Sequence, residues 1–183
     1  MGIQRKAWVL KETGKPLVEE SLELGDPAPS DVIVEVEACG LCHTDLGFAE
    51  GGVAPRMGLP IVLGHEVVGT VRAAGERYAA LVGQKVLVPS VMPCGDCPFC
   101  RAGRGNACLK QKMPGNDING GFGTHHVAPG ASMVSLADAP ASVKTDSLSV
   151  VADAVPTAYQ AVQRPRLKAG AVAFVVGGGA GGG

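Results

Sequence analysis

The sequence predicts a mainly β protein: a barrel-like domain that carries an inserted cysteine-rich lobe, followed by the first strand of a second domain. Three observations lead to this expectation. The 27 glycines and 13 prolines among 183 residues indicate many turns. Several segments alternate apolar and polar residues with the period of a strand. Four of the six cysteines lie together in residues 93–110, where the regular pattern stops.

Short alternating or apolar runs predict the strands of the first domain. Residues 31–39 show the pattern most clearly, because three valines alternate with Ile33 and two glutamates, as in a half-buried strand. Cys39 at the end of this segment is expected on the face of the glutamates. The other expected strands are residues 6–10, 17–24, 67–73, 85–89, 124–128 and 133–136.

The last forty residues change character. From Thr145 the apolar spacing becomes helical, and Pro156 is expected to end or kink this helix. Residues 171–176 are a continuous apolar run that predicts a buried strand. We therefore expect residues 1–155 to form the first domain and residues 156–183 to begin the second.

Composition and charge exclude several classes of protein. A net charge of −1 and a pI near 6.4 provide no basic field for nucleic acid. A hydrophobic content of 46% argues against disorder. The start of the chain lacks a long apolar region, and the apolar tail at 169–183 is short for a membrane span. We expect a cytoplasmic protein with no membrane or nucleic-acid partner, whose cysteines are reduced.

The cysteine-rich lobe has the spacing of a structural zinc site, Cys-x2-Cys-x2-Cys-x7-Cys. Zinc binds four thiolates tetrahedrally at about 2.3 Å, and four cysteines leave no position open for a substrate. Buried or disulfide-paired cysteines are one alternative. A nucleic-acid zinc ribbon is another, but it normally shows two Cys-x2-Cys pairs farther apart. The expected ligands are Cys94, Cys97, Cys100 and Cys108.

A second group of metal-binding residue types precedes the lobe. Cys42 and His65 lie in a region rich in glycine and proline. Alone, this pair is a weak sign, because a small buried cysteine and a satisfied core histidine are common. His125 and His126 lie on an expected strand, carry no motif, and are interpreted as surface or pocket-lining residues.

Taken with the lobe, this group resembles the zinc-containing medium-chain alcohol dehydrogenase superfamily, whose first domain is a GroES-like barrel. The resemblance covers nearly the whole chain. It implies that Cys42 and His65 are the first two ligands of a catalytic zinc and that Glu66 is the carboxylate beside it. It also implies that Asp45 fixes the tautomer of the liganding histidine and that Thr44 accepts the proton of the substrate alcohol.

The third catalytic ligand departs from the cysteine that is usual in the family. Relative to the segment 157–159, the ligand position falls on Asp153, and some members of the family use aspartate. An aspartate in place of the cysteine thiolate leaves the total charge of the zinc site unchanged. Because a carboxylate donates less electron density than a thiolate, the metal is expected to be a stronger Lewis acid. The alternatives are a helix-surface role for Asp153 and ligation by Cys39, which forms Cys-x2-Cys with Cys42.

The proton path is only partly defined by the resemblance. His43 occupies a position where the family often carries a basic residue, which implies a place near cofactor phosphate or a role in proton transfer. The family's relay histidine corresponds to Gly47, so no path beyond Thr44 is expected from these residues.

A glycine-rich segment follows the apolar run 171–176. Gly177, Gly179 and Gly182 form G-x-G-x-x-G, which after a buried strand predicts binding of a dinucleotide pyrophosphate. A segment this rich in glycine matches the motif almost by default. The interpretation therefore depends on the position of the segment after the metal-binding domain. The acidic ribose-binding residue expected about twenty positions later is absent from residues 1–183. We expect this polypeptide, as a fragment or a frameshift product, to bind two zinc ions without dehydrogenase activity.

For the full-length protein the resemblance implies oxidation of a secondary alcohol by hydride transfer to NAD(P), and a homo-oligomer. Segments 42–48, 91–95 and 112–118 are similar to the 6-hydroxycyclohex-1-ene-1-carbonyl-CoA dehydrogenases, which implies an acyl-CoA substrate. The alternatives are a dehydrogenase of another small-molecule alcohol and a zinc-binding fragment without catalysis.

Overall fold

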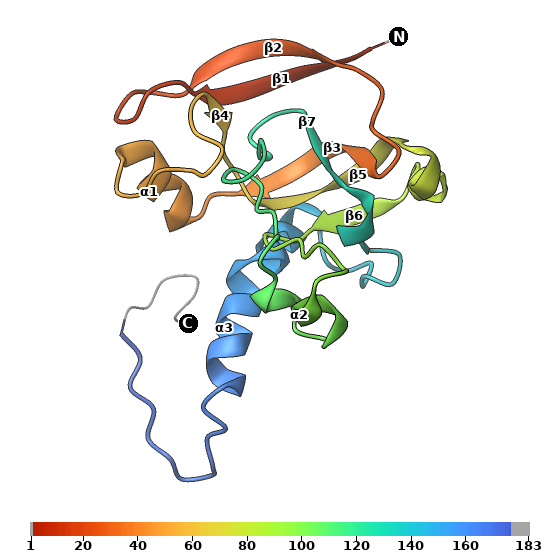
Figure 1. Cartoon of the computed structure of the whole chain (residues 1–183). Helices are drawn as coiled ribbons and strands as arrows, with labels where there is room; N and C mark the ends of the chain where they lie inside the picture. Colours follow the sequence, from red (N-terminus) through yellow and green to blue (C-terminus); the bar gives the residue numbers. More distant parts are fainter. Residues whose placement is uncertain (1, 177–183) are drawn as a thin grey trace.

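The computed structural model describes residues 2–176, which form two antiparallel sheets with short helices around them (Figure 1). The smaller sheet has the strand order β2-β1-β4, and the larger has the order β7-β3-β5-β6-β8. The smaller sheet consists of β1 (Ile3–Leu10), β2 (Val18–Leu24) and β4 (Ile61–Val62). The larger sheet consists of β3 (Asp31–Gly40), β5 (Glu66–Ala74), β6 (Lys85–Val88), β7 (His125–Pro129) and β8 (Val134–Ser135). The prediction of a mainly β domain is confirmed, and only the two-residue strand β4 was not expected.

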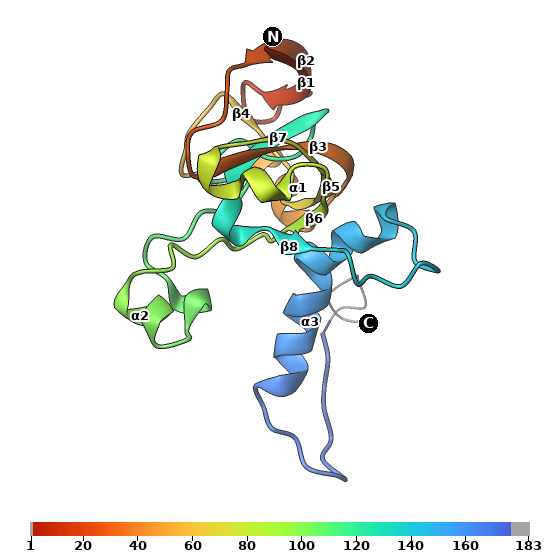
Figure 2. The ribbon, with the colours of Figure 1, turned by 90° about the vertical axis from the view of Figure 1, so that its right-hand side faces the viewer.

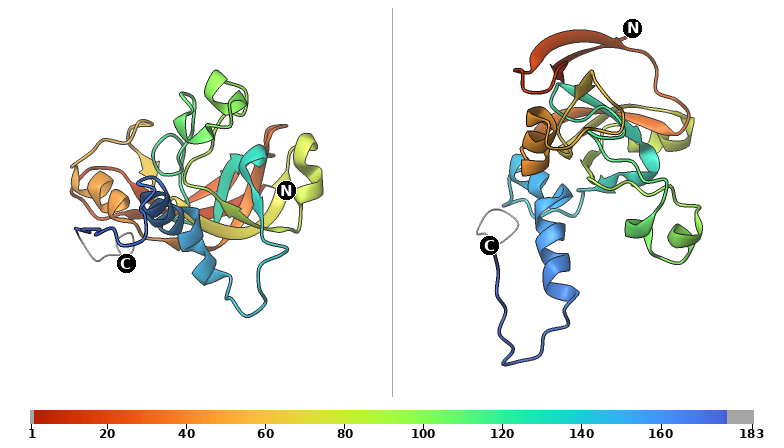
Figure 3. Two further views of the ribbon diagram at one scale, coloured as in Figure 1. Left: turned by 90° about the horizontal axis from the view of Figure 1, so that it is seen from below. Right: turned by 60° about the vertical axis from the view of Figure 1, so that its left-hand side comes forward.

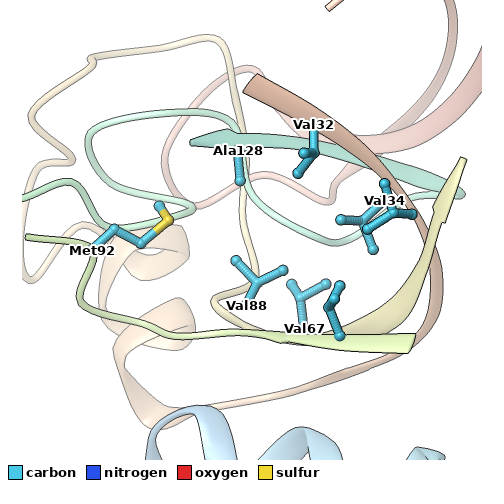
Figure 4. Close-up of a cluster of buried hydrophobic side chains, with 8 residues drawn as sticks. Val32, Val34, Val67, Val88, Met92 and Ala128 are labelled. Carbon is cyan, nitrogen blue, oxygen red and sulfur yellow. The ribbon is translucent and has the colours of Figure 1, made fainter. Parts of the chain in front are cut away.

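The main hydrophobic core lies against the larger sheet. Alternate residues of its central strands point to one side, where valines from β3, β5 and β6 pack together (Figure 4). Val34, Val67 and Val88 are fully buried there, and Met92 closes the end of the cluster. The alternation that predicts these strands therefore creates the core.

Strand β3 contains an irregularity that the sequence pattern does not reveal. Its register against β5 shifts between Val36 and Ala38. An extra residue in a strand moves the following side chains to the opposite face. Cys39 consequently packs with Val36 against the main core. The expectation that Cys39 shares a face with the glutamates is therefore wrong.

The helices are short. Helix α1 (His43–Glu50) follows β3, and α3 (Ala154–Gln163) follows a 3-10 turn, η4 (Asp146–Ala152). The remaining helical turns are η1 (Glu76–Leu81), α2 (Pro98–Arg101), η2 (Gly105–Ala107) and η3 (Gly130–Ser132). Among residues 2–176 no helix combines the length and hydropathy needed to cross a bilayer.

The expected break at Pro156 is in the wrong place. The helical path breaks at Asp153, whose φ of −144° and ψ of −63° separate η4 from α3. Pro156 lies in the first turn of α3, where the missing N–H of proline leaves no helical hydrogen bond unmade. Helix α3 also crosses the predicted domain boundary at 155/156.

The cysteine lobe and the end of the described chain lie outside the two sheets. Figure 2 shows α2 and its loops projecting away from the larger sheet. Figure 3 shows α3 extending from the sheets, with the following segment beside it. Residues 171–176 form no strand, and the side chains of Val172 and Phe174 are more than 90% exposed. The predicted buried strand is therefore wrong for this structure, because no strand among residues 2–176 pairs with it.

Candidate metal centres

The four cysteines of the lobe converge around one point. The sulfur atoms lie 3.4 Å apart for Cys97 and Cys100, 3.8 Å for Cys97 and Cys108, and 4.0 Å for Cys94 and Cys100. All six cysteines of the chain are free thiols. A zinc tetrahedron with bonds of about 2.3 Å has edges of about 3.8 Å. The lobe therefore has the dimensions of a structural zinc site with four cysteine ligands.

Backbone N–H groups prepare two of these thiols to be thiolates. The Cys108 sulfur accepts hydrogen bonds from the N–H groups of Cys94 and Lys110, each at 3.3 Å, and its pKa is lowered. The backbone N–H of Cys100 is the main cause that lowers the pKa of Cys97 to about 6. Zinc binds the thiolate form, so these donors favour the metal-binding form of Cys97 and Cys108, whereas the pKa values of Cys94 and Cys100 are raised.

A second convergence lies where α1, β5 and α3 meet. Donor atoms of Cys42, His65, Glu66 and Asp153 all lie within 4.8 Å of one another. The imidazole Nε2 of His65 is 3.3 Å from Asp153 Oδ2, which is 3.8 Å from the sulfur of Cys42. Tetrahedral zinc with such ligands has edges of about 3.4 and 3.6 Å. Cys42 and Asp153, which are 111 positions apart in sequence, are thus spaced as two ligands of one ion.

Asp45 joins the two segments that carry Cys42 and His65. Its buried carboxylate accepts hydrogen bonds of 3.0 Å from the N–H of Cys42 and from the N–H of Gly64. Its Oδ1 also lies 3.3 Å from Nδ1 of His65. Gly64 has φ +93°, and a Cβ there would meet Phe122 and Cys39, so only glycine permits this approach. Asp45 therefore sets the position and orientation of the imidazole.

The surroundings of His65 fit a cation at Nε2. The ring is fully buried, and each nitrogen faces a carboxylate at 3.3 Å without the geometry of a hydrogen bond. Burial lowers the pKa of His65, but the carboxylates of Asp153 and Asp45 outweigh it and raise the pKa to about 10. The pocket therefore stabilises positive charge. A metal ion between Nε2 and Asp153 supplies that charge with a neutral imidazole as ligand.

Hydroxyl groups hold the other oxygen of Asp153. Oδ1 accepts a hydrogen bond of 3.0 Å from the Ser90 hydroxyl and one of 3.3 Å from the Thr157 hydroxyl. His65 is the largest cause that lowers the pKa of Asp153, and the hydroxyls of Ser90 and Thr157 lower it further. The carboxylate therefore stays ionised. Ser90 was missed by sequence reasoning, since a single serine after a strand carries no pattern.

Glu66 lies beside this group as the first residue of β5. Its side chain is buried, and burial raises the pKa of its carboxyl group. A Cβ on Gly40 would collide with the Glu66 carboxylate, so β3 leaves room for it only through glycine. Cys42, His65, Glu66 and Asp153 thus supply a mixed set of thiolate, imidazole and carboxylate donors for a catalytic zinc site, in contrast to the closed set of four cysteines in the lobe.

Comparison with known proteins places the chain in a family. The model of the alcohol dehydrogenase GroES-like domain matches residues 28–138, more than half of the chain. The chain belongs to this family. The matched residues include all five strands of the larger sheet and the cysteine lobe that projects from it.

Relatives extend the similarity beyond residue 138. D-arabinose 1-dehydrogenase (NADP(+)) of Saccharolobus solfataricus is 32% identical over 88% of this chain and 46% of its own length. An NAD-dependent alcohol dehydrogenase of Sulfolobus acidocaldarius is 30% identical over 96% of this chain and 52% of its own. The structure of acetophenone reductase from Geotrichum candidum in complex with NAD superposes with a TM-score of 0.79 and 29% identity, covering 90% of this chain and 48% of that chain. The chain therefore spans about half the length of these relatives.

The remaining predicted site residues of this GroES-like domain belong to neither group of metal-binding residues. Thr44 is exposed at the start of α1, with its hydroxyl 3.7 Å from the sulfur of Cys42. His43 is exposed beside it and lies outside the group of four donors. Cys39 also lies outside that group. His126 is buried in β7, which excludes the surface position for that residue. Gly177, Gly179 and Gly182 lie outside the described residues.

Proposed function

We propose that this chain is the catalytic domain of a zinc-dependent dehydrogenase that oxidises a secondary alcohol with NAD(P). One observation carries the proposal: Cys42, His65 and Asp153 present three unlike donors at tetrahedral spacing, and Asp153 also lines an open hollow. The hollow has a volume of about 640 Å³ and is lined by Asp153, Ser90 and apolar side chains such as Val91 and Val151. Three protein ligands beside a hollow leave a coordination position for an oxygen, as catalytic zinc sites do.

Each residue of the site has a role in this proposal. Cys42, His65 and Asp153 hold the ion, which when bound supplies Lewis-acid polarisation of an oxygen. The exposed hydroxyl of Thr44 takes the proton of the alcohol. Glu66 is the buried carboxylate that can approach the ion when a neighbouring ligand moves. The four-cysteine lobe has no open position and serves the stability of the fold.

The cofactor is proposed from the relatives together with the glycine-rich segment. The relatives are named as NADP(+)- and NAD-dependent enzymes, and acetophenone reductase was solved with NAD. We assign Gly177, Gly179 and Gly182 to the pyrophosphate site of a second domain that begins at residue 156. His43, the first residue of α1, is assigned to contact with cofactor phosphate or to proton transfer.

Two finer proposals rest on resemblance alone. The substrate is a 6-hydroxycyclohex-1-ene-1-carbonyl-CoA, on the similarity of segments 42–48, 91–95 and 112–118. The full-length enzyme is a homo-oligomer, as is usual in the family.

Zinc content and hydride transfer test the proposed function separately. We expect about two zinc ions per chain by elemental analysis, falling to about one in Asp153→Ala. The control Asp138→Ala removes an aspartate that belongs to neither group of metal-binding residues, and it keeps two. The protein encoded by the whole gene is expected to form NAD(P)H, followed at its absorption band, when secondary alcohols are supplied. Unchanged zinc in Asp153→Ala removes Asp153 from the site, and two zinc ions without hydride transfer favour a zinc-binding protein that is not an enzyme.

A further inference from the structure

The two oxygens of the Asp153 carboxylate have different surroundings. Oδ2 faces the proposed metal position, 3.3 Å from Nε2 of His65 and 3.8 Å from the sulfur of Cys42. Oδ1 points to hydroxyl donors, with Ser90 Oγ at 3.0 Å. We propose that Ser90 is a positioning residue that holds Oδ1 and so presents Oδ2 alone to the metal. This inference rests on the proposed function, in which Asp153 is the third ligand.

Ser90 is fixed more firmly than the aspartate it contacts. It comes two residues after β6, is 6% exposed, and its backbone N–H donates to the carbonyl of Ala152 at 3.2 Å. The backbone N–H and the hydroxyl of Ser90 therefore donate hydrogen bonds to two consecutive residues, Ala152 and Asp153. Asp153 lies in the break between η4 and α3, and 27% of its side chain is exposed. Without the serine, this partly exposed carboxylate in an irregular segment keeps only the longer hydrogen bond from Thr157 to Oδ1 and is held less firmly.

A carboxylate can bind a metal through one oxygen or through both. Binding through both occupies an additional coordination position, which a catalytic zinc site keeps open. A hydrogen bond from the Ser90 hydroxyl to the ionised carboxylate is charge-assisted, and it occupies the oxygen that would otherwise compete for the ion. Thr157 makes a longer bond of 3.3 Å to the same oxygen from α3, so it gives weaker support.

The test uses residues 1–183 loaded with Zn²⁺ or Co²⁺. We expect Ser90→Ala to lower metal affinity at the Cys42 site about tenfold in a chelator competition, the lower end of the range for groups that orient a ligand. The visible absorption of Co²⁺ at this site is expected to shift, because the coordination through Asp153 changes. Thr157→Val is expected to have a smaller effect, and Ser90→Thr is expected to restore the affinity.

The design separates this inference from the proposed function. The four-cysteine lobe is an internal reference whose metal affinity stays unchanged in every variant. Ser149→Ala, a buried serine in η4 without a hydrogen bond to Asp153, is the matched control and keeps the wild-type affinity and spectrum. If Ser90→Ala binds two metals with wild-type affinity and spectrum, the positioning role is wrong while the proposed function stands. If the wild type binds a single metal, the proposed function fails, and this inference fails with it.

Discussion

His126 provides a test of how far burial controls charge in this domain. Its ring is completely buried on β7, and neither nitrogen makes a hydrogen bond with good geometry among residues 2–176. Burial, with a smaller contribution from the Arg5 cation, lowers the pKa of His126 to about 4. Arg5 is itself buried and donates to the carbonyl of Gly120 at 2.8 Å. A second positive charge beside it is therefore strongly unfavourable.

The sign and size of the effect on stability follow from the two pKa values. In the unfolded chain His126 titrates near 6.5, so acid protonates the unfolded state first and shifts the equilibrium toward unfolding. The lost stability is negligible above pH 7.5, reaches about 2 kcal/mol at pH 5, and approaches about 3 kcal/mol below pH 4. Because the ring is fully buried, this shift needs no reduction for solvent screening.

Urea denaturation at pH 7.5 and pH 5 measures the effect. His126→Leu removes the titrating group, so the loss of unfolding free energy between the two pH values is expected to be about 2 kcal/mol smaller than in the wild type. Metal release and the titration of carboxylates also change the unfolding free energy with pH. They do so in both proteins, so their contributions cancel in this difference. His125→Gln is the matched comparison: burial also lowers the pKa of that half-buried side chain, so it is expected to reduce the pH dependence less than His126→Leu does. Equal pH dependence in wild type and His126→Leu refutes the reasoning.

Three further predictions concern the metal centres. Cys108→Ser is expected to bind one zinc fewer and to melt at a lower temperature by calorimetry, because an ion that binds only the folded lobe stabilises it, by about 10 kcal/mol in zinc-finger peptides; an unchanged zinc content contradicts the assignment of the lobe as a zinc site. Asp45→Ala leaves two buried backbone N–H groups without an acceptor and removes the carboxylate beside His65, so the unfolding free energy is expected to fall by about 3 kcal/mol in urea. Gly40→Ala places a methyl group against Glu66 and is expected to cost about 2 kcal/mol in urea, with both zinc ions retained; wild-type stability argues against the packing of Glu66 described above.

The metal ligands illustrate two levels of predictability. The four lobe cysteines lie within fifteen residues, so their spacing alone limits how they can be arranged, and the prediction of a common site is confirmed. Cys42, His65 and Asp153 are far apart in sequence, and their association was expected only through resemblance to a family. Their actual distances depend on how β5 pairs with β3 and on where η4 packs against both strands.

The features that the sequence did not reveal depend on long-range packing. The hydrogen bond from Ser90 to Asp153 joins residues 63 positions apart, and neither residue type predicts it. The face on which Cys39 lies was predicted wrongly because a bulge adds a residue, and a bulge has no fixed sequence signature. The run 171–176 was predicted as a buried strand from its hydropathy, but a strand also requires a neighbour to pair with.

The sequence by itself thus determined the β class of the fold, the four-cysteine lobe and the residue types of the second centre, because alternation and close spacing are local properties of a chain. Tertiary structure alone decided which oxygen of Asp153 faces the metal position, which side chains surround His65, and which apolar segments find a partner. Those properties depend on contacts between distant segments, and the free energy of each contact is set by the surroundings that folding creates.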